Sequence, residues 1–155
     1  MPRRSAKHCG GGTSPAQQRI NRARSVATLS RLLELNFPDG ARLIVLAYDP
    51  GGYIPAGAYA EPDIVDWLRW VSRQLGGVFQ YVRATAQEPT TVHRVITAIQ
   101  RTDAEDLAAH WEYGPASVEE IAGEQFPVLA EQIAGKAGAY RHSWIASKGL
   151  KRPQT

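Results

Sequence analysis

Two runs of β-branched and aromatic residues lie close together in the chain, and they constrain its fold more than any other feature. The runs are VFQYVRAT at 78–85 and TVHRVITAI at 91–99, and a short Gln-Glu-Pro connection separates them. Residues of these types are enriched in strands, and two strands with a short connection pair in antiparallel fashion. The sequence therefore predicts a β-hairpin over 78–99.

Helical and strand patterns flank this hairpin on both sides. Ser14 followed by Pro15 is typical of a helix start, and the acids Glu61 and Asp63 suit the positive end of another helix. Apolar spacing and turn residues delimit the remaining elements. The predicted elements are a helix over 14–36, a strand over 42–48, a helix over 61–75, the hairpin, a helix capped by Thr102 or Asp103 that contains Trp111, a strand over 116–121 and a helix over 125–137.

The order of these elements predicts the fold class. Without the first and last helices it reads β-α-β-β-α-β, the arrangement of a ferredoxin-like split unit. We expect an α+β domain with an antiparallel sheet of about four to five strands. Helices are expected to pack on one face of the sheet, with basic extensions at both ends of the chain.

Length and terminal composition predict one domain with two tails. A chain of 155 residues is long enough for one core and too short for two full domains. We expect a disordered basic tail over 1–13, a single domain over 14–147 and a basic tail over 148–155. Because the sequence has neither a long apolar span nor an apolar leader, we expect a cytoplasmic protein without membrane contact. Cys9 is the only cysteine, which excludes an internal disulfide.

Charge is segregated along the chain more strongly than the net charge of +3 indicates. Residues 1–31 and 136–155 contain Lys and Arg but no acid, whereas all the carboxylates lie between them. Clustered cations are typical of phosphate contact, because neutralised phosphates release their counterions. The alternative interpretation is a pair of solvated tails that keep the protein soluble.

His93 and Arg94 stand side by side in the second run of the hairpin. Alternate strand residues share a face, so these two side chains are expected on opposite sides of the sheet. A second histidine two positions after His93 would place two imidazoles within reach of one divalent ion. Val95 occupies that position, so the sequence predicts no metal site here. His93 could equally be a buried hydrogen-bonding residue.

Several segments resemble the rolling-circle replication initiators of the His-hydrophobe-His endonuclease superfamily, which plasmids, phages and integrative elements encode. The resemblance covers roughly residues 35–153. It is most specific in the Asn-Phe pair with the first strand, in the strand that bears His93, and in the terminal SKGLKRP. It implies a bacterial mobile element as the source.

The resemblance also implies a nicking chemistry whose residues are incomplete in this chain. In that family two strand histidines bind Mg²⁺ or Mn²⁺ and a helix tyrosine attacks the DNA phosphate. His93 matches the first histidine, Val95 stands at the second, and Gln132 stands where the tyrosine belongs. We therefore expect no cofactor and no metal-dependent nicking, with Mg²⁺ or Mn²⁺ bound only if another ligand joins His93.

Nucleic-acid binding is the function that these patterns favour, with single-stranded DNA or RNA as the partner. The expected contacts are Arg19, Arg22, Arg24, Arg83, Arg94, Lys136, Arg141, Lys148, Lys151 and Arg152. Arg and aromatic side chains of the hairpin, Tyr81 among them, can clamp phosphates and stack on bases.

Two other functions remain open. The stretch from Asp103 to Glu131 contains acids but no Lys or Arg. It could mimic phosphate and block a host nucleoprotein such as a CRISPR effector, as anti-CRISPR proteins do. Alternatively, His93 with Arg94, Lys136 or His142 could act as base and phosphate clamp in a metal-free ribonuclease.

Overall fold

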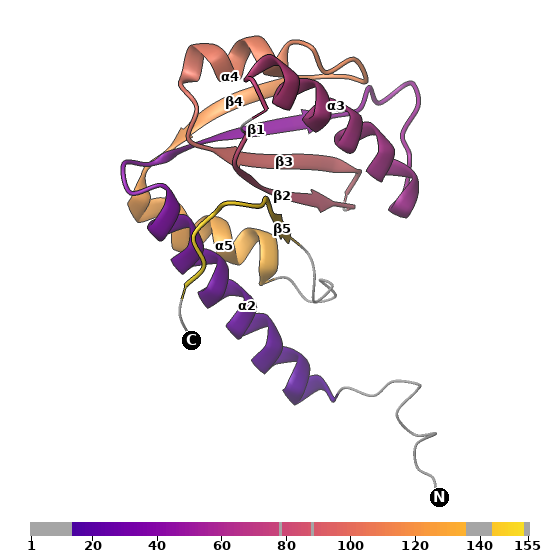
Figure 1. The fold of residues 1–155 in the computed structure, drawn as a ribbon. Coiled ribbons are helices and arrows are strands. Elements are labelled where there is room, and N and C mark those ends of the chain that lie inside the picture. Colours follow the sequence, from indigo (N-terminus) through magenta and orange to yellow (C-terminus); the bar gives the residue numbers. More distant parts are fainter. Residues whose placement is uncertain (1–13, 78, 88, 136–143, 154–155) are drawn as a thin grey trace, which may run out of the picture.

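The computed structural model describes residues 14–77, 79–87, 89–135 and 144–153. Within them, five strands form one antiparallel sheet in the order β4-β1-β3-β2-β5 (Figure 1). The elements are α2 (Pro15–Asn36), β1 (Ala41–Ala47), the 3₁₀ turn η1 (Gly57–Ala60), α3 (Glu61–Gln74), β2 (Tyr81–Ala86), β3 (Val92–Thr97), α4 (Arg101–Ala108), β4 (Ala116–Ile121), the 3₁₀ turn η2 (Gly123–Gln125), α5 (Phe126–Ala134) and β5 (Trp144–Ala146). The segment from β1 to β4 has the ferredoxin-like order, so the predicted α+β fold class is confirmed.

The predicted hairpin is present, and its two strands, β2 and β3, lie inside the sheet. β2 and β3 pair from Tyr81 opposite Thr97 to Ala86 opposite Val92. β3 also pairs with β1, whose other side pairs with β4. β1 and β3 therefore lie inside the sheet, which accounts for their aliphatic sequences.

Helices cover both faces of the sheet, because alternate strand residues point to opposite sides. On one face, α3 and α4 pack over Ile44, Leu46 and Val95. On the other face, α2 and α5 pack over Leu43 and Ile96. The two helix layers lie above and below the sheet in Figure 1. The expectation of helices on one face is therefore wrong for the chain as a whole. It holds for the crossover helices α3 and α4, whereas α2 and α5 lie outside the ferredoxin-like unit and cover the second face.

Helix α2 packs on the domain through its C-terminal half. Ser14 caps the helix by accepting a hydrogen bond from the backbone N–H of Gln17 at 3.0 Å, as the Ser-Pro start predicts. The buried residues of α2 lie between Leu29 and Leu33, whereas residues 14–21 are all exposed. The N-terminal half extends away from the sheet (Figure 1).

The start and the end of α4 differ from the prediction. Gln100 has an extended backbone and precedes the first helical residue, so Thr102 and Asp103 lie inside the first turn. Trp111 lies beyond the helix, where its indole Nε1 donates to the carbonyl oxygen of Ala47 at 2.6 Å. The tryptophan thus joins the end of α4 to β1.

The C-terminal segment packs against α2 and β2, although the sequence predicts a basic tail outside the domain from residue 148 onward. β5 pairs with β2, and the indole Nε1 of Trp144 donates to Ser25 Oγ at 3.0 Å. Leu150 belongs to the core cluster on the α2 side. The side chain of Asn36 both donates to the carbonyl and accepts from the N–H of Lys151, at 2.8 Å each. The described part of the predicted tail is therefore held against the domain.

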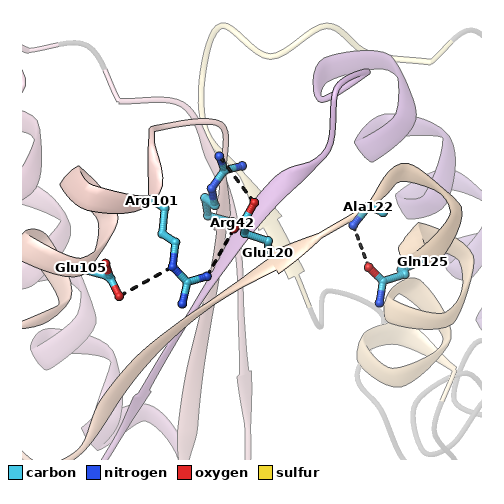
Figure 2. Close-up of polar contacts among 6 residues, drawn as sticks. All are labelled: Arg42, Arg101, Glu105, Glu120, Ala122 and Gln125. Carbon is cyan, nitrogen blue, oxygen red and sulfur yellow. Dashed lines mark hydrogen bonds and ion pairs between the residues drawn. The ribbon is translucent and has the colours of Figure 1, made fainter.

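Ion pairs join α4 to the β4 edge of the sheet. Arg101 lies 3.5 Å from Glu120 and 3.7 Å from Glu105, and Arg42 lies 4.0 Å from Glu120 (Figure 2). Nearby, Gln125 Oε1 accepts a hydrogen bond from the N–H of Ala122 at 2.7 Å. Because both groups of the Arg101 pairs are exposed, and the Arg42 contact with Glu120 is long, each pair contributes about 1 kcal/mol at most. Their main effect is to offset part of the negative charge on this edge.

Candidate functional site

His93 and Arg94 point to opposite faces of the sheet, as the strand alternation predicts. His93 is 1% exposed and lies on the α3 side with Val95. Arg94 is half-buried on the α2 side, level with Val45 of β1 and Ala84 of β2. The two side chains therefore do not share a site.

A chain of hydrogen bonds surrounds His93. Its Nε2 lies 2.9 Å from Tyr48 Oη, which donates to Asp63 Oδ2 at 2.8 Å. Its Nδ1 lies 2.8 Å from Thr85 Oγ1. Because Tyr48 gives its one proton to Asp63, His93 donates from Nε2 and accepts at Nδ1 from Thr85. This neutral tautomer satisfies both ring nitrogens of His93 and the hydroxyl of Tyr48.

The surroundings keep His93 uncharged at neutral pH. Burial lowers the pKa of His93 to about 4, although the negative charge of Asp63 favours the protonated ring. Burial, with the hydrogen bond to Asp63, raises the pKa of Tyr48 above its usual range. The chain therefore connects β1, α3, β3 and β2 without a change of charge near pH 7.

Aromatic rings close this polar chain on the side of β1. The ring centroid of Tyr48 lies 5.5 Å from Trp111, 5.9 Å from Tyr113 and 6.0 Å from Tyr53. These separations are those of rings in direct contact. Burial and the charge of Asp63 raise the pKa values of Tyr53 and Tyr113. These aromatic rings cover the buried carboxylate of Asp63. His93, which is 1% exposed, is therefore inaccessible to a large ligand.

The residues mapped onto the nicking chemistry are not brought together. Gln132 is exposed on α5, which packs on the α2 side of the sheet, whereas His93 is buried on the α3 side. Both ring nitrogens of His93 have hydrogen-bond partners, so metal binding or base catalysis would first have to break one of these bonds. Within the described residues, no three His, Cys, Asp or Glu side chains form a group that could hold a metal ion. Lys136 and His142, the other candidates for nuclease chemistry, lie outside the described residues.

A basic groove lies on the same face, between α3 and β2. It has a volume of about 430 Å³, and its lining residues are Val65, Leu68, Arg69, Ser72, Arg73, Tyr81 and Arg83. Arg69 and Arg73 are one helical turn apart and therefore share a face of α3. Three arginines and one tyrosine thus line an open, partly apolar groove.

The three arginines differ in how firmly they are held. Arg83 makes two hydrogen bonds to the Glu61 carboxylate, at 3.0 and 2.7 Å, and its side chain is 11% exposed. This pairing raises the pKa of Arg83 and lowers the pKa of Glu61. The Arg83 Nε is buried without a hydrogen-bond partner. Arg69 makes a long, exposed contact with Asp66 at 3.8 Å. No ion pair involves Arg73 within the described chain, so Arg73 is the groove cation with the least internal compensation.

The other predicted phosphate contacts fall into separate places. Lys148 is exposed directly after Ser147, which exchanges two hydrogen bonds with the main chain of Tyr81 beside the groove. Lys151 and Arg152 are exposed on the same C-terminal segment. The candidates on the N-terminal half of α2 are Arg19, Arg22 and Arg24. Lys136 and Arg141 lie outside the described residues.

Two groups of site residues were missed by the sequence interpretation. Tyr48, Asp63 and Thr85 are separated from His93 along the chain, and only the strand pairing and the packing of α3 on the sheet bring them together. Arg69 and Arg73 had a usable signal, since two arginines at i and i+4 on an exposed helix face indicate a local positive surface.

No family model matches the chain, and neither does any curated protein or solved structure in the comparisons. The resemblance to replication initiators therefore stays a hypothesis. Among the described helices, none combines the length and the hydropathy that crossing a bilayer requires.

Proposed function

We propose that this protein binds single-stranded nucleic acid through the groove between α3 and β2. The observation that carries the proposal is an open groove lined by the exposed Arg69 and Arg73 together with Tyr81, beside Arg83, which Glu61 compensates. Guanidinium groups bind phosphate oxygens with two parallel hydrogen bonds, and an aromatic ring offers a surface for an unpaired base. Lys148, on the segment beside Tyr81, adds a further positive charge.

The groove favours a single strand over a duplex. In a duplex the bases are stacked and paired, so Tyr81 could reach base edges but not base faces. A single strand can present phosphates to the arginines and an unstacked base to the ring. The partly apolar lining from Val65 and Leu68 suits the base and not the phosphate.

The proposed function does not include nicking. Val95 and Gln132 stand at the positions of the second histidine and the tyrosine of the initiators that the chain resembles. The two faces of the sheet separate His93 from Gln132. We propose a binding protein of replication-initiator-like fold from a mobile genetic element.

Arg73→Ala tests the proposed groove. Fluorescence anisotropy with a labelled oligonucleotide of about 16 nucleotides, the upper end of site sizes for single-strand binding modules, measures Kd across a salt series. We expect weaker binding and a slope of log K against log salt that is reduced by about 0.7, the share of one phosphate contact.

Arg101→Ala is the matched control, because Arg101 lies by the β4 edge, at the opposite side of the sheet from β2. It should leave both Kd and the salt slope unchanged. Equal effects of Arg73→Ala and Arg101→Ala would argue against the groove. Failure of the wild-type chain to bind any oligonucleotide at low salt would refute the function itself.

The antagonist hypothesis stays a prediction. The acidic surface that it requires is present in part, since Asp103, Asp106 and Glu124 are exposed near the β4 edge. However, Arg101 and Arg42 contact Glu105 and Glu120 within the same surface (Figure 2). This internal pairing reduces the negative charge available for phosphate mimicry. The structure therefore supports nucleic-acid binding by the groove more strongly than it supports the antagonist hypothesis.

A further inference from the structure

Large apolar side chains are exposed in the segment that joins β1 to α3. Tyr53 is 56% exposed, Ile54 is 41% exposed and Tyr59 is 80% exposed. An exposed tyrosine ring on a soluble domain is common alone, but a cluster within seven residues marks an interaction surface. None of the predicted site residues lies in this segment.

The segment is tied to the hairpin that carries the groove. Thr91 Oγ1 donates to the carbonyl of Pro55 at 2.7 Å, and the N–H of Gly57 donates to Gln87 Oε1 at 3.2 Å. Gln87 directly follows β2. These bonds fix the backbone of the segment against the end of the hairpin.

Tyr59 lies in η1 between two points of attachment to β2. Two residues before it, Gly57 is bound to Gln87. Two residues after it, Glu61 holds Arg83 with two hydrogen bonds. The η1 backbone that carries the exposed Tyr59 therefore lies at the Arg83 end of the groove and is anchored on both sides.

We propose that Tyr59 is a base-stacking residue that extends the groove onto η1. The proposal rests on the proposed function, since it assigns a second contact to the same ligand. A strand whose phosphates lie along Arg69 and Arg73 would pass Arg83 and present its next unstacked base to the Tyr59 ring. Alternation of cations and exposed aromatic rings is the pattern that single-strand binders use.

Charge decides between a base and an apolar protein surface as the occupant. The groove beside η1 has two exposed arginines, and an apolar partner would have to cover Arg69 and Arg73 without compensating them. A polynucleotide satisfies both requirements, because it offers an anionic backbone and a flat aromatic base in the same repeating unit.

Tyr59→Ala and Tyr59→Trp test this contact by anisotropy with two probes. One probe is a labelled oligothymidylate of about 16 nucleotides, and the other is an abasic oligonucleotide of the same length. Loss of one stacked base should weaken the binding of oligothymidylate by about tenfold in the alanine variant. The salt slope should not change, because no phosphate contact is lost. Tyr59→Trp should bind at least as tightly as wild type.

The abasic probe isolates the stacking contribution. It should bind the wild-type chain and the Tyr59→Ala variant equally, since it has no base to stack. Val128→Ala removes an exposed apolar side chain from α5 on the other face and should change neither probe. Arg73-dependent binding that Tyr59→Ala leaves unchanged for oligothymidylate would overturn the stacking contact alone. Absence of oligonucleotide binding by the wild-type chain would overturn the proposed function together with it.

Discussion

At the scale of single residues, the fold selects one protonation state for His93. The ring is 1% exposed, and its two nitrogens are occupied by Tyr48 and Thr85. A charged imidazolium would lose its hydration and would turn Nδ1 from an acceptor into a donor. The same residue that suggests metal chemistry in the sequence therefore acts in the structure as a connection between strands.

The pH dependence of stability should report this state. The pKa of His93 is about 4 in the folded chain, against about 6.5 for an unperturbed histidine. Between these values the unfolded chain binds the proton and the folded chain does not. The contribution of His93 to the free energy of unfolding is therefore fully present above about pH 6.5. It is lost as pH falls toward 4, and the free energy of unfolding falls by about 3 kcal/mol in total. Urea unfolding at several pH values measures this loss.

Two histidine variants separate this contribution from that of the carboxylates. His93→Gln should flatten the profile between pH 6.5 and 4. His110→Gln, at an exposed histidine that stacks on Trp70, is the control for the histidine-to-glutamine substitution itself. Identical profiles for the wild type and His93→Gln would show that His93 is not held neutral.

Tyr48→Phe tests the next residue of the chain. It removes the hydroxyl that joins His93 Nε2 to Asp63 Oδ2 and leaves both buried groups without this partner. We expect the free energy of unfolding to fall by about 1–3 kcal/mol, measured by urea denaturation at pH 7. Tyr59→Phe removes a hydroxyl from an exposed ring and should stay within about 0.5 kcal/mol of wild type. Similar values for the two variants would contradict the role of the buried chain.

At the scale of elements, the sequence predicts the structure where local pattern and burial agree. The hairpin and α3 have strong periodicity, and both are present as predicted. β5 was not predicted, because three residues in a basic segment carry no periodicity of their own. Its structure depends on the β2 edge and on the contact between Trp144 and Ser25, 119 residues apart in the chain. Of the residues that line the groove, the sequence indicates Arg83 and Tyr81 as candidate contacts. Their position beside Arg69 and Arg73 depends on how α3 crosses the sheet, which no local pattern predicts.

Asn36→Ala tests how the C-terminal segment is held. The side chain makes hydrogen bonds to the Leu32 carbonyl and to both main-chain groups of Lys151. Its loss should cost about 1–3 kcal/mol of stability and should speed amide hydrogen exchange in residues 144–153. Asn21→Ala, on the exposed half of α2, is the matched control and should change neither quantity. Unaltered exchange in Asn36→Ala would show that Leu150 and β5 hold the segment without this side chain.

At the scale of the whole molecule, the sheet separates charges and candidate chemistry. The groove and Lys148 lie at the β2–β5 side, whereas Glu119 and Glu120 lie on β4 at the opposite edge. A polyanion that approaches the molecule is therefore attracted to one edge and repelled by the other. The projecting half of α2, with Arg19 and Arg24, adds positive charge on the second face.

The same separation leads to a prediction about nicking that differs from the one that the family resemblance implies. By resemblance alone, Val95→His together with Gln132→Tyr would restore both missing groups. In this structure position 95 faces α3, while α5 lies on the other side of the sheet. A phenol at position 132 could then not reach a phosphate beside His93.

We expect no covalent DNA-linked peptide from the wild type, from Gln132→Tyr or from the double variant. Each protein is incubated with single-stranded DNA and Mn²⁺, and the products are analysed by denaturing gel and mass spectrometry. Gln132→Tyr alone changes an exposed residue, so its fold should be retained even if a histidine at buried position 95 destabilises the chain. An adduct at position 132 in either variant would require α5 and His93 to share one face, and it would restore the initiator mechanism as the ancestral use of this sheet.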